Sequence, residues 1–290
     1  MIDIILLLTV VLGCTALNIL TKSYGLKHPE GGALTFCAFS CITVCFFFLV
    51  SGGFELKFDL GLIPYVIGFG ISYGLGTIMA YYAIRTGSLS LTSLITSYSL
   101  VIPTFYGLFF LGDDVGILFY IGLVLLFVSL FLIGIKKDES EGEVKISPVW
   151  VLCVTLAFLG NGLCSTFQTA QQKAFLGEYK NELMIFSLIF VSIALLVLAL
   201  IVERRVFIST VKSCFGYALG YGVLNGLANL CVMLLTGGNR LSTAIIFPSI
   251  SAGQIVTAVI FAIIIYKEKL SKSDIASVIL GTAAVILMNV

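Results

Sequence analysis

The sequence predicts an all-α integral membrane protein with ten transmembrane helices, built as two inverted repeats of five helices each. Three observations lead to this prediction. Hydrophobic residues make up 59% of the 290 positions and charged residues only 11%, whereas soluble domains hold about 45–50% and about 25%. Apolar runs of roughly 20 residues recur along the chain, and each can cross about 30 Å of hydrocarbon as a helix. The two halves of the chain also resemble each other in order and spacing.

Short polar breaks separate the ten apolar runs. In chain order the predicted spans cover residues 4–24, 32–50, 62–84, 89–111, 115–135, 149–172, 183–202, 215–235, 241–266 and 275–290. The first run has no basic segment before it and no small-residue cleavage site after it, so we interpret it as a helix rather than a signal peptide. The strongly charged stretch 136–147 predicts a linker between a first repeat, 1–135, and a second repeat, 148–290.

Similar residues recur between the halves at a separation of 150 positions. The matches are Gly70 with Gly220, Gly76 with Gly226, Leu91 with Leu241, and Ser99 with Ser249. Because five spans are an odd number, the second half must enter the membrane from the opposite side, which makes the repeat inverted. Such symmetry suits a protein that presents one site alternately to two faces, since exchanging the conformations of the halves interconverts the two open states.

Charge and cysteine content exclude several classes of function. The net charge is +1 and no block of Lys or Arg is present, which argues against a nucleic-acid partner. The eight cysteines lie in or near apolar runs without a C-x-x-C pair. We interpret them as packing residues, because thiolate ligands for a metal would be costly in hydrocarbon. No metal and no cofactor is expected.

The candidate binding site consists of uncharged polar side chains, because ionisable residues are nearly absent from the spans. Amides, hydroxyls and tyrosines recur three or four residues apart on spans 1, 3, 6 and 8, which puts them on common helix faces. They either join helices at about 0.6 kcal/mol per hydrogen bond or line a polar cavity near the midplane. We favour the cavity, because spans 2, 5, 7 and 10 nearly lack amides. The candidates are Asn18, Tyr73, Thr77, Tyr81, Ser97, Asn161, Gln168, Gln172, Asn225, Asn229, Ser251 and Gln254.

Two prolines and three basic residues complete the candidate set. Pro103 and Pro248 lie inside the fourth and ninth spans, where each removes a backbone hydrogen bond and predicts a kink or hinge. Lys22, Arg85 and Lys173 lie near span ends. Snorkelling of these side chains to the lipid headgroups competes there with a role at the mouth of a substrate pathway.

Two pairs of segments resemble the EamA-like members of the drug/metabolite transporter superfamily. They are Y-Y-A-I-R-T-G-S-L-S-L-T-S-L at 81–94 with L-V-I-P-T-F-Y-G-L-F-F-L-G-D-D at 100–114, and F-P-S-I-S-A-G-Q at 247–254 with Y-K-E-K-L-S at 266–271. Through the ten-span plan the resemblance covers the whole chain. It implies a permease for amino acids, metabolites or toxic compounds, with a central cavity lined by spans 1, 3, 4, 6, 8 and 9. For the acidic residue that closes each fourth repeat helix, here Asp113 or Asp114 and Glu268, it implies a structural interface role.

The orientation in the membrane has two opposed predictions. Twelve Lys and Arg residues lie at the ends of spans 1, 3, 5, 7 and 9, and four lie on the other side. By the positive-inside rule, this count places both termini outside the cytoplasm. The resemblance implies cytoplasmic termini instead.

The leading functional hypothesis is alternating-access transport of a small polar or zwitterionic metabolite, with an amino acid as one possibility. A lipid flippase or passive channel is the alternative, because a neutral polar lining suits those functions too. A membrane-embedded enzyme is disfavoured, since no His, Asp or Glu cluster supplies an acid, a base or a metal site. We expect a multi-pass protein of a bacterial plasma membrane whose partners are its small-molecule substrate and the lipid bilayer, and a homodimer stays open. Without a deep carboxylate, facilitated diffusion or exchange is expected rather than proton antiport.

Overall fold

The computed structural model describes residues 2–29, 31–86, 89–134, 147–238, 240–266 and 272–288. Within these ranges every regular element is a helix and none is a strand, so the predicted all-α class is confirmed. The linker that was predicted at 136–147 lies almost wholly outside the described residues.

The helices follow the apolar runs of the sequence. In chain order they are α1 (Ile2–Lys27), α2 (Ala33–Ser51), α3 (Ile63–Thr86), α4 (Leu89–Tyr98), α5 (Val101–Phe110), α6 (Ile117–Gly134), α7 (Pro148–Ala174), α8 (Lys180–Val202), α9 (Phe207–Gly237), α10 (Thr243–Tyr266) and α11 (Lys272–Met288), with a 3-10 helix at Leu60–Leu62. Each predicted span overlaps one helix, except that the fourth is divided into α4 and α5.

The length and composition of these helices are those of a multi-pass membrane protein. Six stretches of the described chain are long and apolar enough to cross a membrane, namely Ile2–Gly25, Ala33–Ser51, Leu60–Ala83, Pro148–Ala174, Lys180–Val202 and Phe207–Gly237. Shorter apolar stretches lie at Ile95–Phe110, Ile117–Ser129 and Ile279–Met288. An α-helix is the natural form for such runs, because in lipid every backbone N–H and C=O must be satisfied within the segment.

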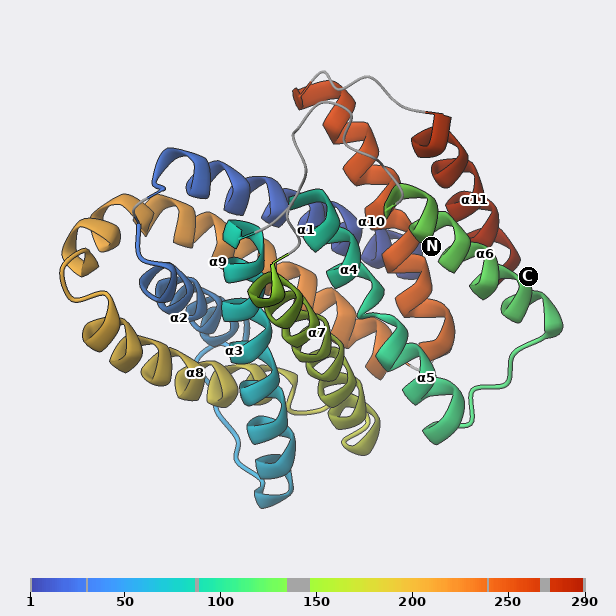
Figure 1. Ribbon diagram of the computed structural model, residues 1–290. Helices are drawn as coiled ribbons and strands as arrows, with labels where there is room; N and C mark the ends of the chain where they lie inside the picture. The colour runs from blue at the N-terminus through green and yellow to red at the C-terminus, as the bar shows by residue number, and fades with distance from the viewer. Residues whose placement is uncertain are drawn as a thin grey trace.

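The helices pack in two groups (Figure 1). One group contains α1, α2, α3, α7, α8 and α9, in which α1 packs on α9, α3 on α7, and α2 on both α8 and α9. The other contains α4, α5, α6, α10 and α11, in which α6 packs on α11 and α5 on α10. The groups meet where α10 contacts α1 and where α4 and α5 contact α7.

Glycines allow the closest helix crossing in the first group. A Cβ atom at Gly160 of α7 would lie 2.6 Å from the backbone nitrogen of Gly76 on α3. Only hydrogen at these positions allows the two backbones to touch, as at other small-residue contacts between membrane helices. The close contact between α3 and α7 therefore depends on glycine at both positions.

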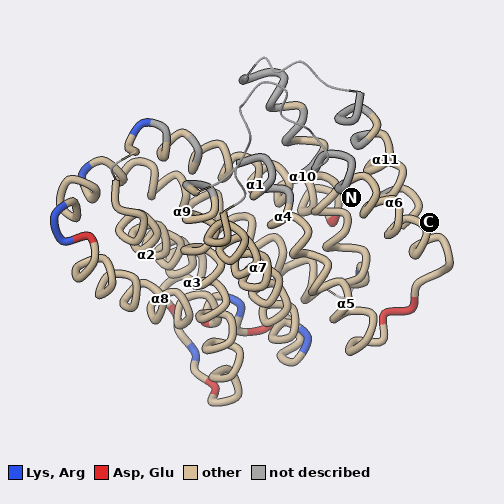
Figure 2. The backbone as a smooth tube through the Cα atoms, in the orientation of Figure 1, with Lys and Arg blue, Asp and Glu red and all other residues tan. Residues whose placement is uncertain are grey.

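The described turns segregate to two opposite ends of the molecule. At one, here called the basic end, the turn after α1 meets the start of α9, because Gly32 N donates to Thr210 Oγ1 at 2.9 Å. At the other, here called the acidic end, Asp3 near the N-terminus forms an ion pair with Arg240 at 3.5 Å, and Lys57 N donates to Glu182 Oε1 at 3.3 Å. Figure 2 shows that the charged residues of the described chain lie at these helix ends, with uncharged segments between them.

The two prolines that were predicted to interrupt helices have different surroundings. Pro103 is the third residue of α5, and the helix division lies at Ser99 and Leu100, one turn earlier. The carbonyl of Ser99, which a residue at position 103 would normally pair with, instead accepts from Ile102 N at 3.0 Å. Pro248 lies inside α10, which continues through it without a division.

Candidate functional site

Four of the predicted site residues form one connected set of hydrogen bonds, here called the amide network. Tyr73 Oη of α3 donates to Asn225 Oδ1 of α9 at 3.3 Å. Asn229 Nδ2, one turn further along α9, donates to the same oxygen at 2.9 Å. Gln168 Nε2 of α7 donates to Asn229 Oδ1 at 3.2 Å. The network therefore joins three helices from both halves of the chain.

The amide network is buried and carries no charge. Gln168 is 2% exposed and Tyr73 is 8% exposed, while Asn225 and Asn229 are half-buried. Amide and phenol groups supply both donors and acceptors. Since such bonds are worth only about 0.6 kcal/mol each between membrane helices, a small polar solute with equivalent groups can replace them at little cost.

Tyrosine and phenylalanine side chains extend from the amide network toward the basic end. Tyr221 of α9, one turn before Asn225, lies near the Tyr73 hydroxyl. The ring of Phe36 on α2 lies 6.2 Å from that of Tyr221 and 6.4 Å from that of Tyr81. Tyr24 of α1 stacks on Phe36 at 4.4 Å. Tyr24 and Phe36 could not be predicted from the sequence, because an aromatic residue in an apolar run is equally compatible with a lipid-facing position.

A second group of amides continues along α7 toward the acidic end. Gln172 Nε2 donates to Gln171 Oε1 at 2.5 Å, and Gln171 Nε2 donates to the carbonyl of Glu178 at 2.9 Å. Gln172 Oε1 is buried and has no hydrogen-bond partner among the described residues. Buried acceptors are normally paired, so this oxygen is available to a water molecule or a polar ligand. Gln171 was not among the predicted residues, although it lies three residues from Gln168 on the same helix.

Other predicted residues meet at the division between α4 and α5. Asn161 Nδ2 of α7 donates to Ser99 Oγ at 2.6 Å, and Ser251 Oγ of α10 donates to the carbonyl of Ser97 at 3.2 Å. The division thus receives one polar side chain from each of two neighbouring helices. The sequence analysis identified Ser99 only as the residue that matches Ser249 in the second repeat. It did not predict a polar contact at Ser99, because nothing indicated that the helix would end there.

The remaining candidates lie in separate surroundings. Asn18 is exposed on α1, Thr77 is half-buried on α3, and Lys173 is partly buried near the end of α7. Gln254 of α10 lies within hydrogen-bonding reach of Cys14 on α1. The side chains of Lys22 and Arg85 lie outside the described part of the chain.

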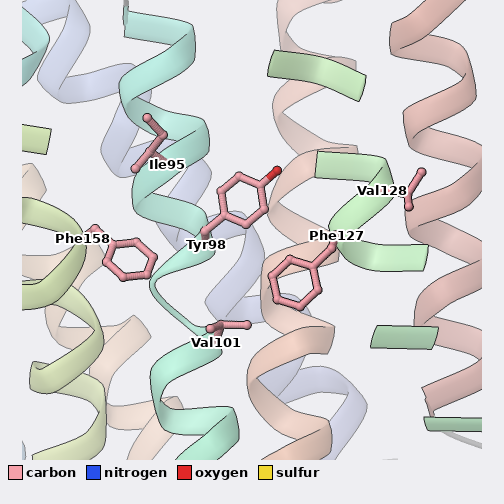
Figure 3. Close-up of a pocket in the computed structure, with 6 residues that line it drawn as sticks. All are labelled: Ile95, Tyr98, Val101, Phe127, Val128 and Phe158. Atoms are coloured by element: carbon pink, nitrogen blue, oxygen red, sulfur yellow. The ribbon is translucent and has the colours of Figure 1, made fainter. Parts of the chain in front are cut away.

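Two surface cavities lie outside the amide network, and no residue of the network lines either of them. Cavity 1 has a volume of about 580 Å³ and lies between α4, α5, α6 and α7. Figure 3 shows its apolar lining, which consists of Ile95, Tyr98, Val101, Phe127, Val128 and Phe158. Cavity 2, of about 500 Å³, is a groove between α1 and α9.

Two carboxylates bind the N-termini of helices that are distant in sequence. Asp113 Oδ2 accepts from Ala244 N at 2.8 Å, at the start of α10. Glu203, just after α8, accepts from Leu34 N at 2.8 Å and from Thr35 N at 2.9 Å, at the start of α2. A carboxylate is favourable there because it satisfies free N–H groups and faces the positive end of the helix dipole. Asp114 is exposed, and Glu268 lies outside the described residues.

Comparison with known proteins identifies the fold but no function. No protein-family model matches the sequence, and no curated protein matches it. One solved crystal structure, described only as that of a protein, superposes with a TM-score of 0.75 over 99% of this chain and 98% of its own. The two sequences are 13% identical. This chain therefore shares its fold, from end to end, with a protein of known structure.

Proposed function

We propose that this protein is an alternating-access membrane transporter of a small polar or zwitterionic metabolite, with amino acids as the first class to test. The amide network carries the proposal. It gathers uncharged donors and acceptors from α3, α7 and α9 inside an apolar bundle. A polar solute that leaves water must find equivalent partners in the protein, because an unpaired polar group is costly in an apolar interior.

The packing of the helices supports the ten-helix inverted repeat that this mechanism needs. Exchange of the halves replaces α1 by α7, α2 by α8, α3 by α9, the pair α4 and α5 by α10, and α6 by α11. The α1–α9 contact then becomes the α7–α3 contact, and the α2–α9 contact becomes the α8–α3 contact. The α1–α10 contact becomes the contact of α7 with α4 and α5. The contacts α2–α8, α5–α10 and α6–α11 are converted into themselves. All of these contacts are present. A packing whose main contacts are retained on exchange of its halves supports two related ways to open.

The proposal also covers the family, the energy source and the location. The segments that resemble EamA-like drug/metabolite transporters, together with a fold compatible with ten spans, support membership of that family. The amide network contains no ionisable carboxylate, so exchange or facilitated diffusion is proposed rather than proton coupling. A bacterial plasma membrane is proposed as the location from the resemblance alone.

A lipid flippase is the second candidate, and cavity 1 is the observation that favours it. Its lining is almost wholly apolar and it opens between α4, α6 and α7. A cavity of this kind suits an acyl chain better than a zwitterionic metabolite.

Ligand-dependent thermal stability tests the proposal first. The purified protein is melted in detergent with amino acids, nucleosides, organic cations and anionic metabolites, because a ligand that binds the folded state raises Tm. We expect one polar class to raise Tm by several degrees, and Gln168→Ala and Asn229→Ala to abolish that shift. Asn181→Ala is the matched control, since Asn181 contacts Ser51 at the acidic end. Counterflow of the same compound in proteoliposomes must then be lost in the network variants.

Two results would overturn the proposal. One is the absence of any Tm shift together with the absence of counterflow for every polar class. The other is rapid exchange of labelled phospholipid between leaflets, insensitive to both network variants, which would favour the flippase.

A further inference from the structure

Cavity 2 is a groove whose lining changes from apolar to polar along its length. Its apolar part consists of Ala16, Ile19 and Leu20 of α1 and Gly216 of α9. Its polar part, nearer the basic end, consists of Ser23 of α1 with Ser213 and Tyr217 of α9. A Cβ atom built at Gly216 would meet no heavy atom within 4 Å. The groove is therefore open at this glycine rather than filled by a neighbouring helix.

The groove is continuous with the outward surfaces of both helices. On α1, the exposed residues Leu8 and Leu12 lie on the same face as Ala16, Ile19 and Ser23, since these positions are three or four residues apart. On α9, the exposed Phe215 and Leu219 flank Gly216. In a membrane these apolar faces contact lipid chains, so the groove opens toward the bilayer.

A lysine lies at the polar end of the groove. Ser23 and the Tyr217 ring line this end together, and Lys27, one turn after Ser23 on α1, lies near the Tyr217 hydroxyl. Lys27 is the last residue of α1 and its side chain is exposed. A lysine at this depth extends its ammonium group to the headgroup region while its methylene stem stays against apolar surface.

The surroundings of this lysine are basic in the described chain. Lys212, Arg204 and Arg205 are exposed at the same end, where Figure 2 shows Lys and Arg on the α8–α9 turn and at the end of α1. The one acidic side chain described there, Glu203, already accepts hydrogen bonds from Leu34 N, Thr35 N and Thr35 Oγ1. The positive charge at this end is therefore not neutralised by the described carboxylates.

We propose that the α1–α9 groove binds one anionic phospholipid from the leaflet at the basic end. The phosphate contacts Lys27, with Ser23 and the Tyr217 hydroxyl as further donors, and an acyl chain lies over Gly216 and Leu20. Charge selects the lipid, because basic pockets between membrane helices bind anionic headgroups. The open space at Gly216 determines where the chain lies. This site is separate from the amide network and does not depend on the identity of the transported solute.

The test titrates the purified full-length protein in neutral detergent with phosphatidylglycerol, with phosphatidylcholine of the same chains, and with inorganic phosphate. We expect phosphatidylglycerol to raise Tm by several degrees and the other two to have no effect. Lys27→Gln removes the charge, and Gly216→Leu adds a side chain to the groove at a position where a Cβ atom meets no neighbour. Each should reduce the shift at least twofold.

Matched controls separate the groove from general effects. Lys180→Gln removes a lysine at the acidic end, and Gly25→Leu adds the same side chain at another open glycine of α1. Both controls should keep the full response to phosphatidylglycerol. Three results would overturn the proposal: an equal response to phosphatidylcholine, an equal response to phosphate alone, which would indicate a free-anion site, or equal losses in the variants and their controls.

Discussion

Two proline-containing segments of similar length differ in their backbone. Residues 89–110 form two helices, α4 and α5, separated by Ser99 and Leu100, whereas residues 243–266 form the single helix α10. Each segment contains one proline, Pro103 in the first and Pro248 in the second. The presence of proline therefore does not by itself decide whether a membrane helix is divided.

The position of the proline and the partners available to the freed carbonyl explain the difference. Pro248 is the sixth residue of α10, so the missing hydrogen bond falls close to the start of the helix, where carboxylate Asp113 already supports the N-terminus. Pro103 lies in the second half of its segment, so its missing bond falls in the middle. There Ser99 accepts from Ile102 N and from Asn161 Nδ2, which stabilises the division.

Among the described residues, the first half has a division at which polar side chains from α7 and α10 meet, and the matching segment of the second half, α10, is undivided. In transporters, helices that are interrupted near the midplane expose backbone groups to a substrate or act as pivots. The following four predictions test whether the difference between the divided segment and the undivided α10 depends on the contacts described here.

The largest effect is expected for Pro103→Ala. Alanine returns an N–H that can pair with the Ser99 carbonyl, and a proline inside a helix costs about 3 kcal/mol. We therefore expect the continuous helix to gain up to about 3 kcal/mol, and solute exchange in proteoliposomes to fall several-fold without loss of Tm. Pro248→Ala is the comparison variant and should change exchange little. Equal effects of the two variants would show that the division has no special role.

Gly162→Ala should have the next largest effect, which is a loss of stability. A Cβ atom there would lie 2.4 Å from Ile102 Cδ1 and 2.7 Å from the Ser99 carbonyl oxygen, at the division itself. Overpacking of this kind destabilises by about 1–3 kcal/mol, despite the better helix propensity of alanine. Gly25→Ala, at an open position on α1, should instead stabilise by about 0.5–1 kcal/mol. Thermal unfolding of the two variants in the same detergent compares them directly, and an unchanged Tm for Gly162→Ala would contradict the close contact.

Asp113→Ala tests whether the Asp113 carboxylate stabilises the N-terminus of α10, the helix that is not divided. The substitution removes the acceptor for Ala244 N at the start of α10 and should cost about 1 kcal/mol. Asp114→Ala changes the exposed neighbouring carboxylate and should have almost no effect on Tm. If the two variants melt together, the 2.8 Å contact contributes nothing measurable.

Asn161→Ala should have the smallest effect, because the lost hydrogen bond to Ser99 Oγ lies between membrane helices, where such bonds average about 0.6 kcal/mol. A double-mutant cycle with Ser99→Ala isolates the pair. We expect the combined loss of stability to be smaller than the sum of the single losses. Additive losses would mean that the two side chains do not interact in the membrane.

Part of the candidate site followed from the sequence, and the reason is helical spacing. Asn225 and Asn229 are one turn apart on α9, and Gln168 and Gln172 are one turn apart on α7, so each pair shares a face whatever the tertiary structure. The structure brings one member of the second pair, Gln168, onto the first pair and gives Gln172 a different neighbour, Gln171. Spacing predicts which residues share a face, and it does not predict which faces meet.

The residues that the sequence missed act through contacts between distant segments. Glu203 follows an apolar span, where the sequence predicts only an exposed charged residue in a turn. In the structure its carboxylate accepts hydrogen bonds from backbone N–H groups at the start of α2. Ser99 reads as one of several serines and threonines in a helix, yet the helix ends there. In both cases the partner lies more than sixty residues away, so no local pattern could have indicated it.

By itself, the sequence determined the all-α class and the approximate limits of the helices. Long apolar runs leave the backbone no other way to satisfy its hydrogen bonds in lipid. The tertiary structure decided which helices pair, where the fourth segment divides, and which amides connect. Helices that are apolar on most sides can turn many faces to one another, so their pairing depends on details such as the Gly76–Gly160 contact, which acts only when two distant helices meet.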